Sequence, residues 1–409
     1  MTVSLWMAEN SGESSTKQTL EFDVAIIGGG VMGASAAQYI AERNRKSTRP
    51  LKAVLIESGH IASGASGRNG GFVLRGIHTY YDTCIQKYGR DTARLIYQMG
   101  EQSQKLIRDF VESRAIDIEY DPCGSYILAS SLEELEDLSR SAKAMQEDGF
   151  ELSLCTEDPL GRGFYGAIHN PGDFGVNPVK FVRALLAASD CEILQNQAIA
   201  SIEINNGSAA VSTTNYQINV PHVLMATNAY TAQLEPLLSD FIKPVRGQMM
   251  ATAPLKKRLV DKLCYANYGF EYFRQLPCLR MLIGGSRQHF IDDEVGFEDV
   301  VTRPLQGVLE HYFKEHFGEA AGAQIQHRWS GVMAATADGL PLVGALPQQK
   351  VLHYLAGCNG HGLGYSMALS RLACDVMLDG ADAGCFAAAR ALTGTKQQNR
   401  HLAKLSTGP

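Results

Sequence analysis

The sequence predicts an α/β fold organised around a βαβ unit, and two observations carry this prediction. The apolar run Val24–Ile27 is followed at once by Gly28-Gly29-Gly30-Val31-Met32-Gly33 and then by small residues typical of a helix. A second apolar run, Ala53–Ile56, ends at an acid, Glu57. Dinucleotide-binding domains have the same order of strand, glycine turn, helix and second strand ending in an acid.

Each residue of this unit has an expected role. Gly28 permits the tight turn, Gly30 lets the backbone approach a pyrophosphate, and Gly33 lets the helix lie close to the strand. Glu57 is placed to accept hydrogen bonds from a ribose, although it follows the turn somewhat later than usual because of the basic loop 43–49. The alternative, a carboxylate that merely ends a strand, is less favoured because the whole unit is present.

Composition indicates a globular protein with more than one domain. The chain has 409 residues, 45% hydrophobic and 20% charged, and this length exceeds a single core. A formal net charge of −6 gives no reason to expect a nucleic acid or an anionic membrane as partner. No apolar run reaches the roughly 20 residues that span a bilayer. We expect residues 1–20 to form a surface lead-in, because they lack the pattern of a secretory signal.

The cysteines and histidines do not predict a metal site. Nine cysteines occur without a Cys-x-x-Cys pair, which indicates reduced thiols in a cytoplasmic protein. His311, Glu315 and His316 share an expected helix, but the histidines are not spaced as i and i+4 ligands would be. We therefore expect a solvated helix face there and no metal.

A loop dense in glycine and serine, residues 58–71, follows Glu57. Such a composition cannot pack a core, but its backbone donors and hydroxyl groups can wrap a ligand. A flexible linker has a similar composition, yet linkers do not usually follow a nucleotide-binding unit directly. We therefore expect this loop to contact the ligand.

Helices dominate the next part of the chain. A helix over 91–113 is expected to bury Leu95, Met99, Leu106 and Phe110, and a strand follows at 124–129. Ser131 and Glu134 form a capping box for a second helix. Its expected inner face is Leu132, Leu135, Leu138, Ala142 and Met145. A third helix begins at Asn177 and Pro178 and turns Phe181, Val182, Leu185 and Leu186 inward.

Strands dominate the second half. Asn205-Asn206-Gly207 predicts a hairpin, and an apolar strand leads into residues 226–230. The segment 244–286 has a β-type pattern rich in aromatic residues, and a helix is expected at 305–317. A strand at 351–356, a glycine loop at 357–364 and a helix stopped by Gly380 close the chain.

Six stretches together resemble the FAD-dependent amine and D-amino-acid oxidase (DAO) superfamily, nearest to the γ-glutamylputrescine oxidase-like enzymes. Besides the glycine turn and the run 64–71, the stretches 226–230 and 244–248 agree in order with this family. So do the aromatic hairpin, 272–274 with 282–285, and one C-terminal segment, 329–331 with 338–344 and then 360–362. The resemblance covers roughly residues 6–380, and it is the combination that is specific.

The resemblance implies a discontinuous Rossmann-like FAD-binding domain of the glutathione-reductase-like type, with an inserted α+β substrate domain built on an antiparallel sheet. We expect the FAD-binding domain to comprise residues 21–80, 174–244 and 329–409, and the substrate domain residues 81–173 and 245–328. Related enzymes that bind flavin covalently use a cysteine near the position of Gly331, so FAD is expected to be bound non-covalently.

The resemblance also implies the site residues. Tyr272 and Arg274 are candidates for the substrate wall, and His361 is expected beside the flavin. A core aromatic residue and a surface salt bridge are equally good interpretations of Tyr272 and Arg274. The cofactor-binding residues are expected to be Gly28, Gly30, Val31, Met32, Gly33, Glu57, Ser58, Ser63, Ser66, Arg68, Asn69, Gly70, Gly71, Ala226, Thr227, Gly331, Gly360, His361, Gly362 and Leu363.

The implied reaction is oxidation of a C–N bond, in which hydride passes from carbon to flavin N5 and the imine is then hydrolysed. Amino-acid-type members place an arginine where this chain has Met333, and methylated-glycine oxidases place a lysine where it has Gly364. A buried carboxylate without a cation is costly. We therefore expect a small amine or polyamine-like substrate, with or without a remote carboxyl, unless Arg274, Arg75 or Arg280 replaces the missing cation.

Two alternatives to this amine oxidoreductase stay open at this point. One is an oxidase or dehydrogenase of an amino or imino acid of the glycine, D-amino acid, sarcosine or proline type, and another is a flavoprotein partner without turnover. The electron acceptor is O2 or a quinone or other carrier. An oxidase is favoured over a dehydrogenase, although Leu282 stands roughly where some oxidases have an oxygen-activating lysine.

Overall fold

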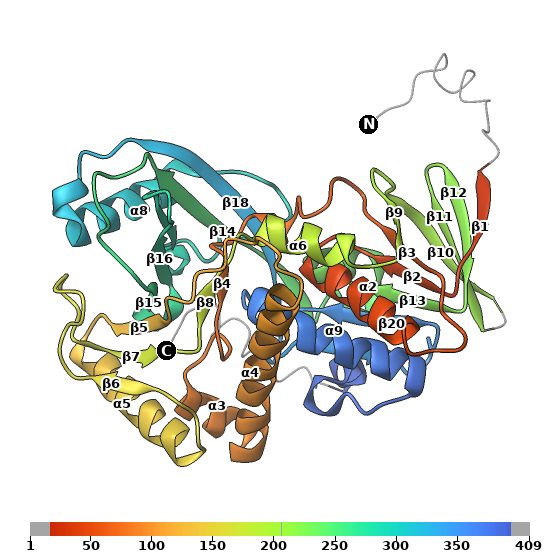
Figure 1. Ribbon diagram of the computed structural model, residues 1–409, viewed down its shortest axis with the longest axis horizontal. Helices are drawn as coiled ribbons and strands as arrows, with labels where there is room; N and C mark the ends of the chain where they lie inside the picture. The colour runs from red at the N-terminus through yellow and green to blue at the C-terminus, as the bar shows by residue number, and fades with distance from the viewer. Residues whose placement is uncertain (1–16, 206, 394–409) are drawn as a thin grey trace.

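The computed structural model describes residues 17–205 and 207–393, which form two lobes, each built on a β-sheet (Figure 1). Of the expected lead-in, residues 1–16 lie outside the described part. Gln18–Glu21 is not a lead-in but a strand, β1, which pairs in parallel with β12. Among the described residues, no helix is both long and apolar enough to cross a membrane.

The first lobe contains a six-stranded sheet that is parallel except at one edge. Its order is β19 (Leu342–Ala345), β20 (Leu352–Ala356), β13 (His222–Met225), β2 (Val24–Ile27), β3 (Ala53–Ile56) and β9 (Glu192–Leu194), with β19 antiparallel to β20. The strands β2 and β3 are completely buried, as expected for parallel strands covered on both faces.

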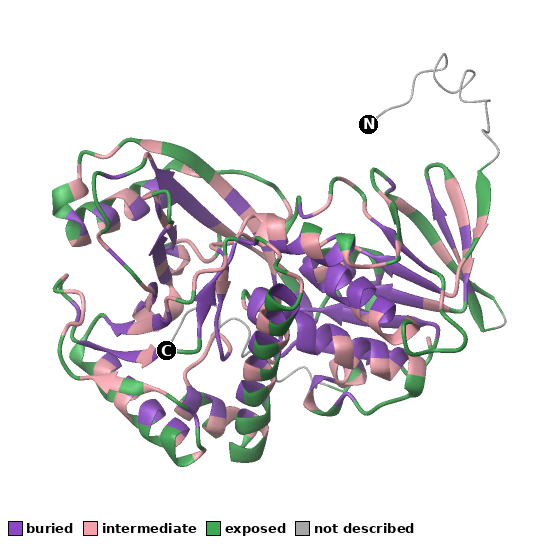
Figure 2. Cartoon of the chain, viewed as in Figure 1, coloured by how far each residue is buried: buried purple, intermediate pink, exposed green. Residues whose placement is uncertain are grey.

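Helices cover one face of this sheet and a second, smaller sheet covers the other. Ile26 and Leu55 point toward α2 (Val31–Asn44), α6 (Pro178–Ala187) and α9 (Gly362–Asp379). Ile27 and Val54 point toward the sheet β1-β12 (Tyr216–Val220)-β11 (Ser208–Thr213)-β10 (Ile199–Asn205). Figure 2 shows how thoroughly α2, α9 and the central strands are buried. The carboxyl ends of β2, β3 and β13 therefore meet at one edge of a rigid layer.

The second lobe contains an eight-stranded sheet. Its order is β18 (Ile325–Thr336), β14 (Ile242–Thr252), β17 (Met281–Gly285), β16 (Glu271–Gln275), β15 (Leu263–Ala266), β5 (Ser125–Ala129), β7 (Gly166–Asn170) and β6 (Ser153–Cys155). All neighbours are antiparallel except β15 and β5. Phe273 and Ile283 pack under α8 (Arg303–His316), so that face of the sheet is a core and the other is free to form a site.

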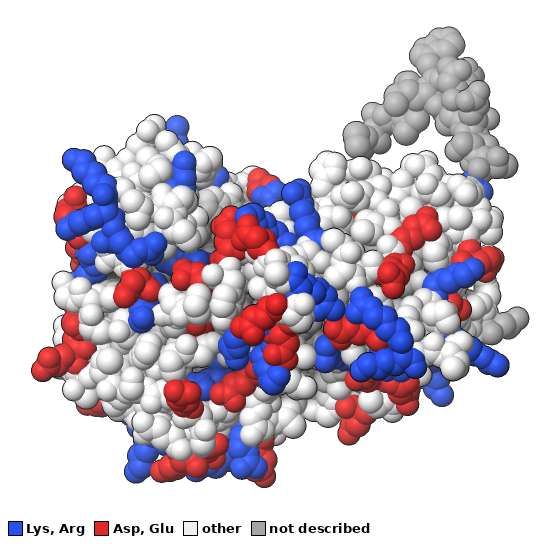
Figure 3. Space-filling view, viewed as in Figure 1, with Lys and Arg blue, Asp and Glu red and all other residues white. Residues whose placement is uncertain are grey.

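The remaining helices and strands pack around these sheets. They are α3 (Tyr81–Tyr88), α4 (Arg90–Glu112), α5 (Leu132–Glu147), the short α7 (Thr231–Leu234) and the two-stranded pair β4 (Phe72–Val73) and β8 (Phe174–Gly175). Helix α4 packs against α9 of the first lobe and α3. On the face shown in Figure 3, side chains of both charge signs are interspersed. The expected fold class is confirmed, whereas the residue limits of the two domains stay a prediction.

Two of the expected helix faces were partly wrong. Leu95 is 48% exposed, and α4 instead buries residues such as Ile96, Tyr97 and Ile107. Leu132 is 65% exposed, because it begins α5 on the solvent side. The expected caps are present: Glu134 N–H donates to Ser131 Oγ at 3.1 Å, and Lys180 N–H donates to Asn177 Oδ1 at 3.1 Å. The hairpin strands β10 and β11 also pair as expected, although Asn206 of the turn lies outside the described residues.

Candidate active site

One large cavity lies between the two lobes. Its volume is about 1110 Å³, and its lining includes the glycine turn after β2, the loop after β3, the end of β13, the N-terminus of α9 and the free face of the eight-stranded sheet. Sites for a single small molecule usually measure about 300–1,000 Å³. The cavity therefore has room for a large cofactor together with a small substrate.

The glycine turn forms a cradle for phosphate groups. Gly28 has φ +116°, and a Cβ there would lie 2.5 Å from the carbonyl oxygen of Ala226. Gly33 lies inside α2, where a Cβ would be 2.0 Å from the carbonyl oxygen of Gly28. Helix α2 has no side-chain cap at Gly30, and the Val31 N–H donates to Ser66 Oγ at 2.8 Å. The N-terminus of α2 thus opens on the cavity with the donors that an anion needs.

Glu57 is held rigidly at the edge of this cradle. Its Oε2 accepts a hydrogen bond from the Gly29 N–H at 2.7 Å, and its Oε1 accepts one from the Gly59 N–H at 2.8 Å. A carboxylate has about four acceptor positions, so it retains capacity for the hydroxyl groups of a ribose. The uncapped helix, the glycine cradle and this oriented acid fit the adenosine diphosphate part of FAD.

Arg68 ties the loop after β3 to the second lobe. Its Nε donates to the Ser63 carbonyl at 2.8 Å, and a terminal nitrogen donates to the Ser330 carbonyl at 2.9 Å. The guanidinium also pairs with Asp299 at 2.6 Å, and Trp329 Nε1 donates to the Arg68 carbonyl at 2.8 Å. The loop that was expected to wrap the ligand is therefore fixed in place by β18.

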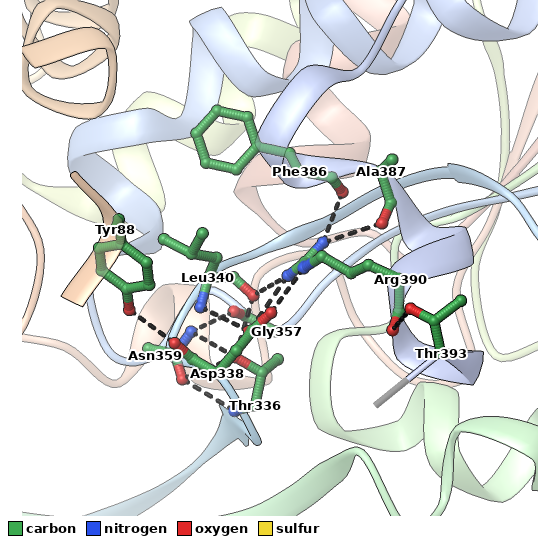
Figure 4. A network of polar contacts seen from close by, with 10 residues as sticks. All are labelled: Tyr88, Thr336, Asp338, Leu340, Gly357, Asn359, Phe386, Ala387, Arg390 and Thr393. Carbon is green, nitrogen blue, oxygen red and sulfur yellow. Dashed lines mark hydrogen bonds and ion pairs between the residues drawn. The ribbon is translucent and has the colours of Figure 1, made fainter. Parts of the chain in front are cut away.

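A polar network holds the loop 357–361, which precedes α9, in place (Figure 4). The Asn359 side chain accepts from the Thr336 N–H at 2.8 Å and donates to the Gly357 carbonyl at 2.6 Å. Arg390 pairs with Asp338 at 2.6 Å and donates to the Leu340 carbonyl at 2.7 Å. Helix α9 begins after His361 without a side-chain cap, so a second helix N-terminus faces the cavity. Such an end stabilises negative charge on a bound group.

Two histidines face the cavity uncharged. Burial lowers the pKa of His361, whose Nδ1 lies 3.1 Å from the Asn359 carbonyl oxygen. Burial also lowers the pKa of His78 to about 3, and its Nδ1 has no hydrogen-bond partner among the described residues. Both imidazoles are therefore neutral near pH 7.

The free face of the eight-stranded sheet forms an aromatic wall. The rings of Tyr265 and Tyr272 are stacked with centroids 5.6 Å apart, Phe72 lies 5.6 Å from Tyr265, and His361 lies 5.9 Å from Tyr265. Burial raises the pKa of Tyr272 to about 12, so its hydroxyl keeps its proton. The stacked side chains of Tyr265 and Tyr272 thus stand beside His361, which was expected to lie next to the flavin.

Glycines on the strands beside this aromatic wall leave room in the cavity, because they carry no side chain. Gly247 of β14 pairs with Gly331 of β18, and Gly284 of β17 pairs with Tyr272. A Cβ on Gly284 would lie 2.4 Å from the Tyr272 ring, and one on Gly247 would lie 3.1 Å from Met333 Cε. Met333, which stands where amino-acid-type members were expected to have an arginine, lines the cavity.

Nearly all of the expected site residues line this cavity. Of the cofactor-binding set, the exceptions are Gly33 and Gly71, which allow close packing of the backbone instead: a Cβ on Gly71 would lie 2.1 Å from the Val176 carbonyl oxygen. Tyr272 and His361 of the catalytic set also line the cavity. Whether these residues contact cofactor or substrate stays a prediction.

Arg274 does not line the cavity, so its placement in the substrate wall is corrected. Its side chain lies on the same face of the sheet as Tyr272 but is only 2% exposed, because residues 70–71 and 175–176 cover it. The guanidinium donates to the Gly71 carbonyl at 3.0 Å and pairs with Asp121 at 3.3 Å. Arg274 therefore supports the backbone behind the loop 63–71.

The other two arginines considered as carboxylate partners are also engaged. Arg75 borders the cavity, but its guanidinium binds Glu101 at 2.6 Å and Asn170 Oδ1 at 2.7 Å. Arg280 donates to the Thr252 carbonyl at 2.9 Å, outside the cavity lining. Sequence reasoning missed Tyr265, His78 and Arg287, which all line the cavity. The stretch Gly284-Gly285-Ser286-Arg287, directly after a strand of the aromatic hairpin, was the available signal for Arg287.

Comparisons with known proteins agree with this geometry. The model of the DAO family, described as FAD dependent oxidoreductase, matches residues 23–376. Gamma-glutamylputrescine oxidoreductase of Escherichia coli (strain K12) is 25% identical over 377 residues, which cover 88% of this chain and 84% of that protein.

Solved structures share the fold. The crystal structure of glycine oxidase from Geobacillus kaustophilus superposes with a TM-score of 0.76 at 23% identity and covers 90% of this chain and 99% of that one. L-proline dehydrogenase from P. horikoshii superposes with a TM-score of 0.76 at 19% identity and covers 91% of this chain and 98% of that one.

Proposed function

Since the chain belongs to the DAO family of FAD-dependent oxidoreductases and FAD is its cofactor, we propose that it oxidises the C–N bond of a small amine or amino-acid-derived substrate. Bound FAD supplies the acceptor for the hydride that leaves the carbon next to the nitrogen. The rest of the reaction depends on how this chain binds and orients the amine.

The aromatic wall is the observation that carries the proposal. Tyr265, Tyr272 and Phe72 line a space that is continuous with the cofactor cradle, and His361, which lies 5.9 Å from Tyr265, is neutral. In such surroundings burial lowers the pKa of an amine, because the charged form loses more hydration than the neutral form. The neutral amine has the free lone pair that assists the loss of hydride.

The choice of substrate follows from the side chains at this wall. Met333 supplies no cation, and Arg75, Arg274 and Arg280 have protein partners, so an α-carboxylate is not expected to be bound as in amino-acid-type members. An amine, with any carboxylate remote from the reacting carbon, fits these residues better. The relative from Escherichia coli, named gamma-glutamylputrescine oxidoreductase, supports an amine of this kind.

We further propose that the protein is an oxidase that passes electrons to O2, in line with the glycine oxidase that shares its fold. We also propose that its FAD is bound non-covalently. Holoenzyme mixed anaerobically with amines, proline and glycine should lose its flavin absorbance with amines first, and then form peroxide when O2 is admitted. Faster bleaching by glycine or proline than by any amine would contradict the substrate proposal, and no bleaching at all would favour a non-catalytic flavoprotein.

Acid precipitation should release the flavin into solution. Flavin retained in the pellet would contradict non-covalent binding.

A further inference from the structure

Arg287 lines the cavity, and its guanidinium has no protein partner among the described residues. It follows β17 after Gly285 and Ser286 and opens a short 3-10 turn, Arg287–His289. Its side chain lines the cavity on the side of Tyr272. Within residues 17–205 and 207–393, the Arg287 guanidinium forms no ion pair and no hydrogen bond, and only Coulombic influence from Tyr272 and Glu294 acts on it besides burial.

Two buried arginines of the neighbouring sheet do have carboxylate partners. Arg246 pairs with Glu294 at 2.7 Å, and Arg274 pairs with Asp121 at 3.3 Å. Glu294 bonds to Arg246 through one oxygen and to Gln248 and Thr302 through the other, and it forms no ion pair with Arg287. Among these arginines of the described residues, Arg287 therefore differs in facing the cavity without a carboxylate partner.

Arg287 is partly shielded from solvent and its guanidinium has no protein acceptor among the described residues. Burial lowers the pKa of Arg287 accordingly. The hydroxyl groups of Tyr265 and Tyr272, which are also partly exposed, likewise have no hydrogen-bond partner among the described residues. Three donors without a protein acceptor thus face one cavity, and a ligand with acceptor atoms would satisfy them.

Resting on the proposed function, we propose that Arg287, together with the Tyr272 hydroxyl, binds a carboxylate carried by the amine substrate. The substrate is then an aminocarboxylate whose acid group is recognised at the end of β17 rather than at Met333 on β18. A guanidinium binds a carboxylate through two parallel hydrogen bonds, so it also sets the orientation of the substrate.

Butanoate is the probe that tests this site without turnover. Its binding to holoenzyme can be followed by the change in flavin absorbance, and Arg287→Met should raise its Kd about 10- to 100-fold, as expected for a lost hydrogen-bonded ion pair. Arg287→Lys, which keeps the charge but not the two-pronged geometry, should fall between the two. Arg280→Met is the matched control, because Arg280 lies outside the cavity lining, and it should bind butanoate as the wild type does.

Turnover provides the second arm. Wild-type enzyme should be reduced faster by 4-aminobutanoate than by butylamine, and Arg287→Met should abolish this preference, whereas Arg280→Met should keep it. Failure of butanoate to bind the wild type, or an unchanged Kd in Arg287→Met, would overturn the inference. So would loss of FAD from Arg287→Met, because the guanidinium would then serve the cofactor. If butanoate binds as expected but no amine bleaches the flavin, the carboxylate site stands and the proposed oxidation fails.

Discussion

Replacing Gly33 by alanine should destabilise the protein, although helix propensity alone predicts the opposite. Alanine favours a helix over glycine by about 1 kcal/mol. At Gly33, however, the new Cβ would lie 2.0 Å from the Gly28 carbonyl oxygen and 3.3 Å from Ile26 Cγ2. Both neighbours belong to the turn and strand that α2 must pack on, so neither can rotate away.

The size of the effect follows from this contact. To move from 2.0 Å to an ordinary contact of 3.4 Å, the start of α2 must shift by about 1.4 Å (3.4 − 2.0). Overpacking of this kind costs about 3 kcal/mol, which after subtracting the helix propensity leaves a net loss of about 2 kcal/mol. The shift also moves the N–H groups that face the cofactor phosphates, and we expect FAD to bind at least about tenfold more weakly.

Urea unfolding of the FAD-free protein and titration with FAD measure these two quantities separately. Gly307→Ala is the matched control, because Gly307 also lies inside a helix, α8, and nothing lies within 4 Å of its added Cβ. This control should gain about 0.5–1 kcal/mol and bind FAD normally. A Gly33→Ala protein as stable as the control, with wild-type affinity for FAD, would refute the packing argument.

Three further predictions follow from the site. Glu57→Gln should weaken FAD binding about tenfold without unfolding the protein, since the charged acceptor of the Gly29 and Gly59 N–H groups is lost, and equal affinity would contradict this role. Arg274→Met should lower the free energy of unfolding by about 3 kcal/mol, because it leaves Asp121 and the Gly71 carbonyl without their partner. The KM for amines should stay unchanged, and a changed KM would return Arg274 to the substrate wall. Burial lowers the pKa of His78 to about 3, so below pH 6.5 the unfolded chain binds a proton that the folded chain refuses, and stability falls on acidification. His78→Gln should flatten the dependence of unfolding free energy on pH by up to about 1.4 kcal/mol per pH unit between pH 6 and 4, and parallel curves would rule this out.

Local signals in the sequence predicted the cofactor side of the molecule well. The turn Gly28–Gly33, the acid Glu57 and the caps at Ser131 and Asn177 depend on contacts within a few residues or within one βαβ unit. Their geometry is therefore set by residue type and spacing, and the structure places them as expected.

The substrate side could not be predicted in the same way, because it depends on what covers each strand. Arg274 and Tyr272 share one face of β16, and only the packing of β4 and β8 over Arg274 removes it from the cavity. Leu95 is apolar but faces solvent, because α9 packs on a different side of α4. Arg287 follows the stretch Gly284-Gly285-Ser286, but no local pattern encodes that it faces the cavity without a carboxylate partner while Arg246 nearby is paired.

The continuity of the cavity has a consequence for how the enzyme keeps its cofactor. The aromatic wall and the phosphate cradle are parts of one continuous space, so the two occupants share a boundary. Linkage requires that a ligand which binds the wall more tightly when FAD is present also raises the affinity for FAD by the same factor. A substrate or carboxylate analogue that binds in this way would therefore tighten the binding of FAD, and a cell rich in substrate would keep more of the protein as holoenzyme.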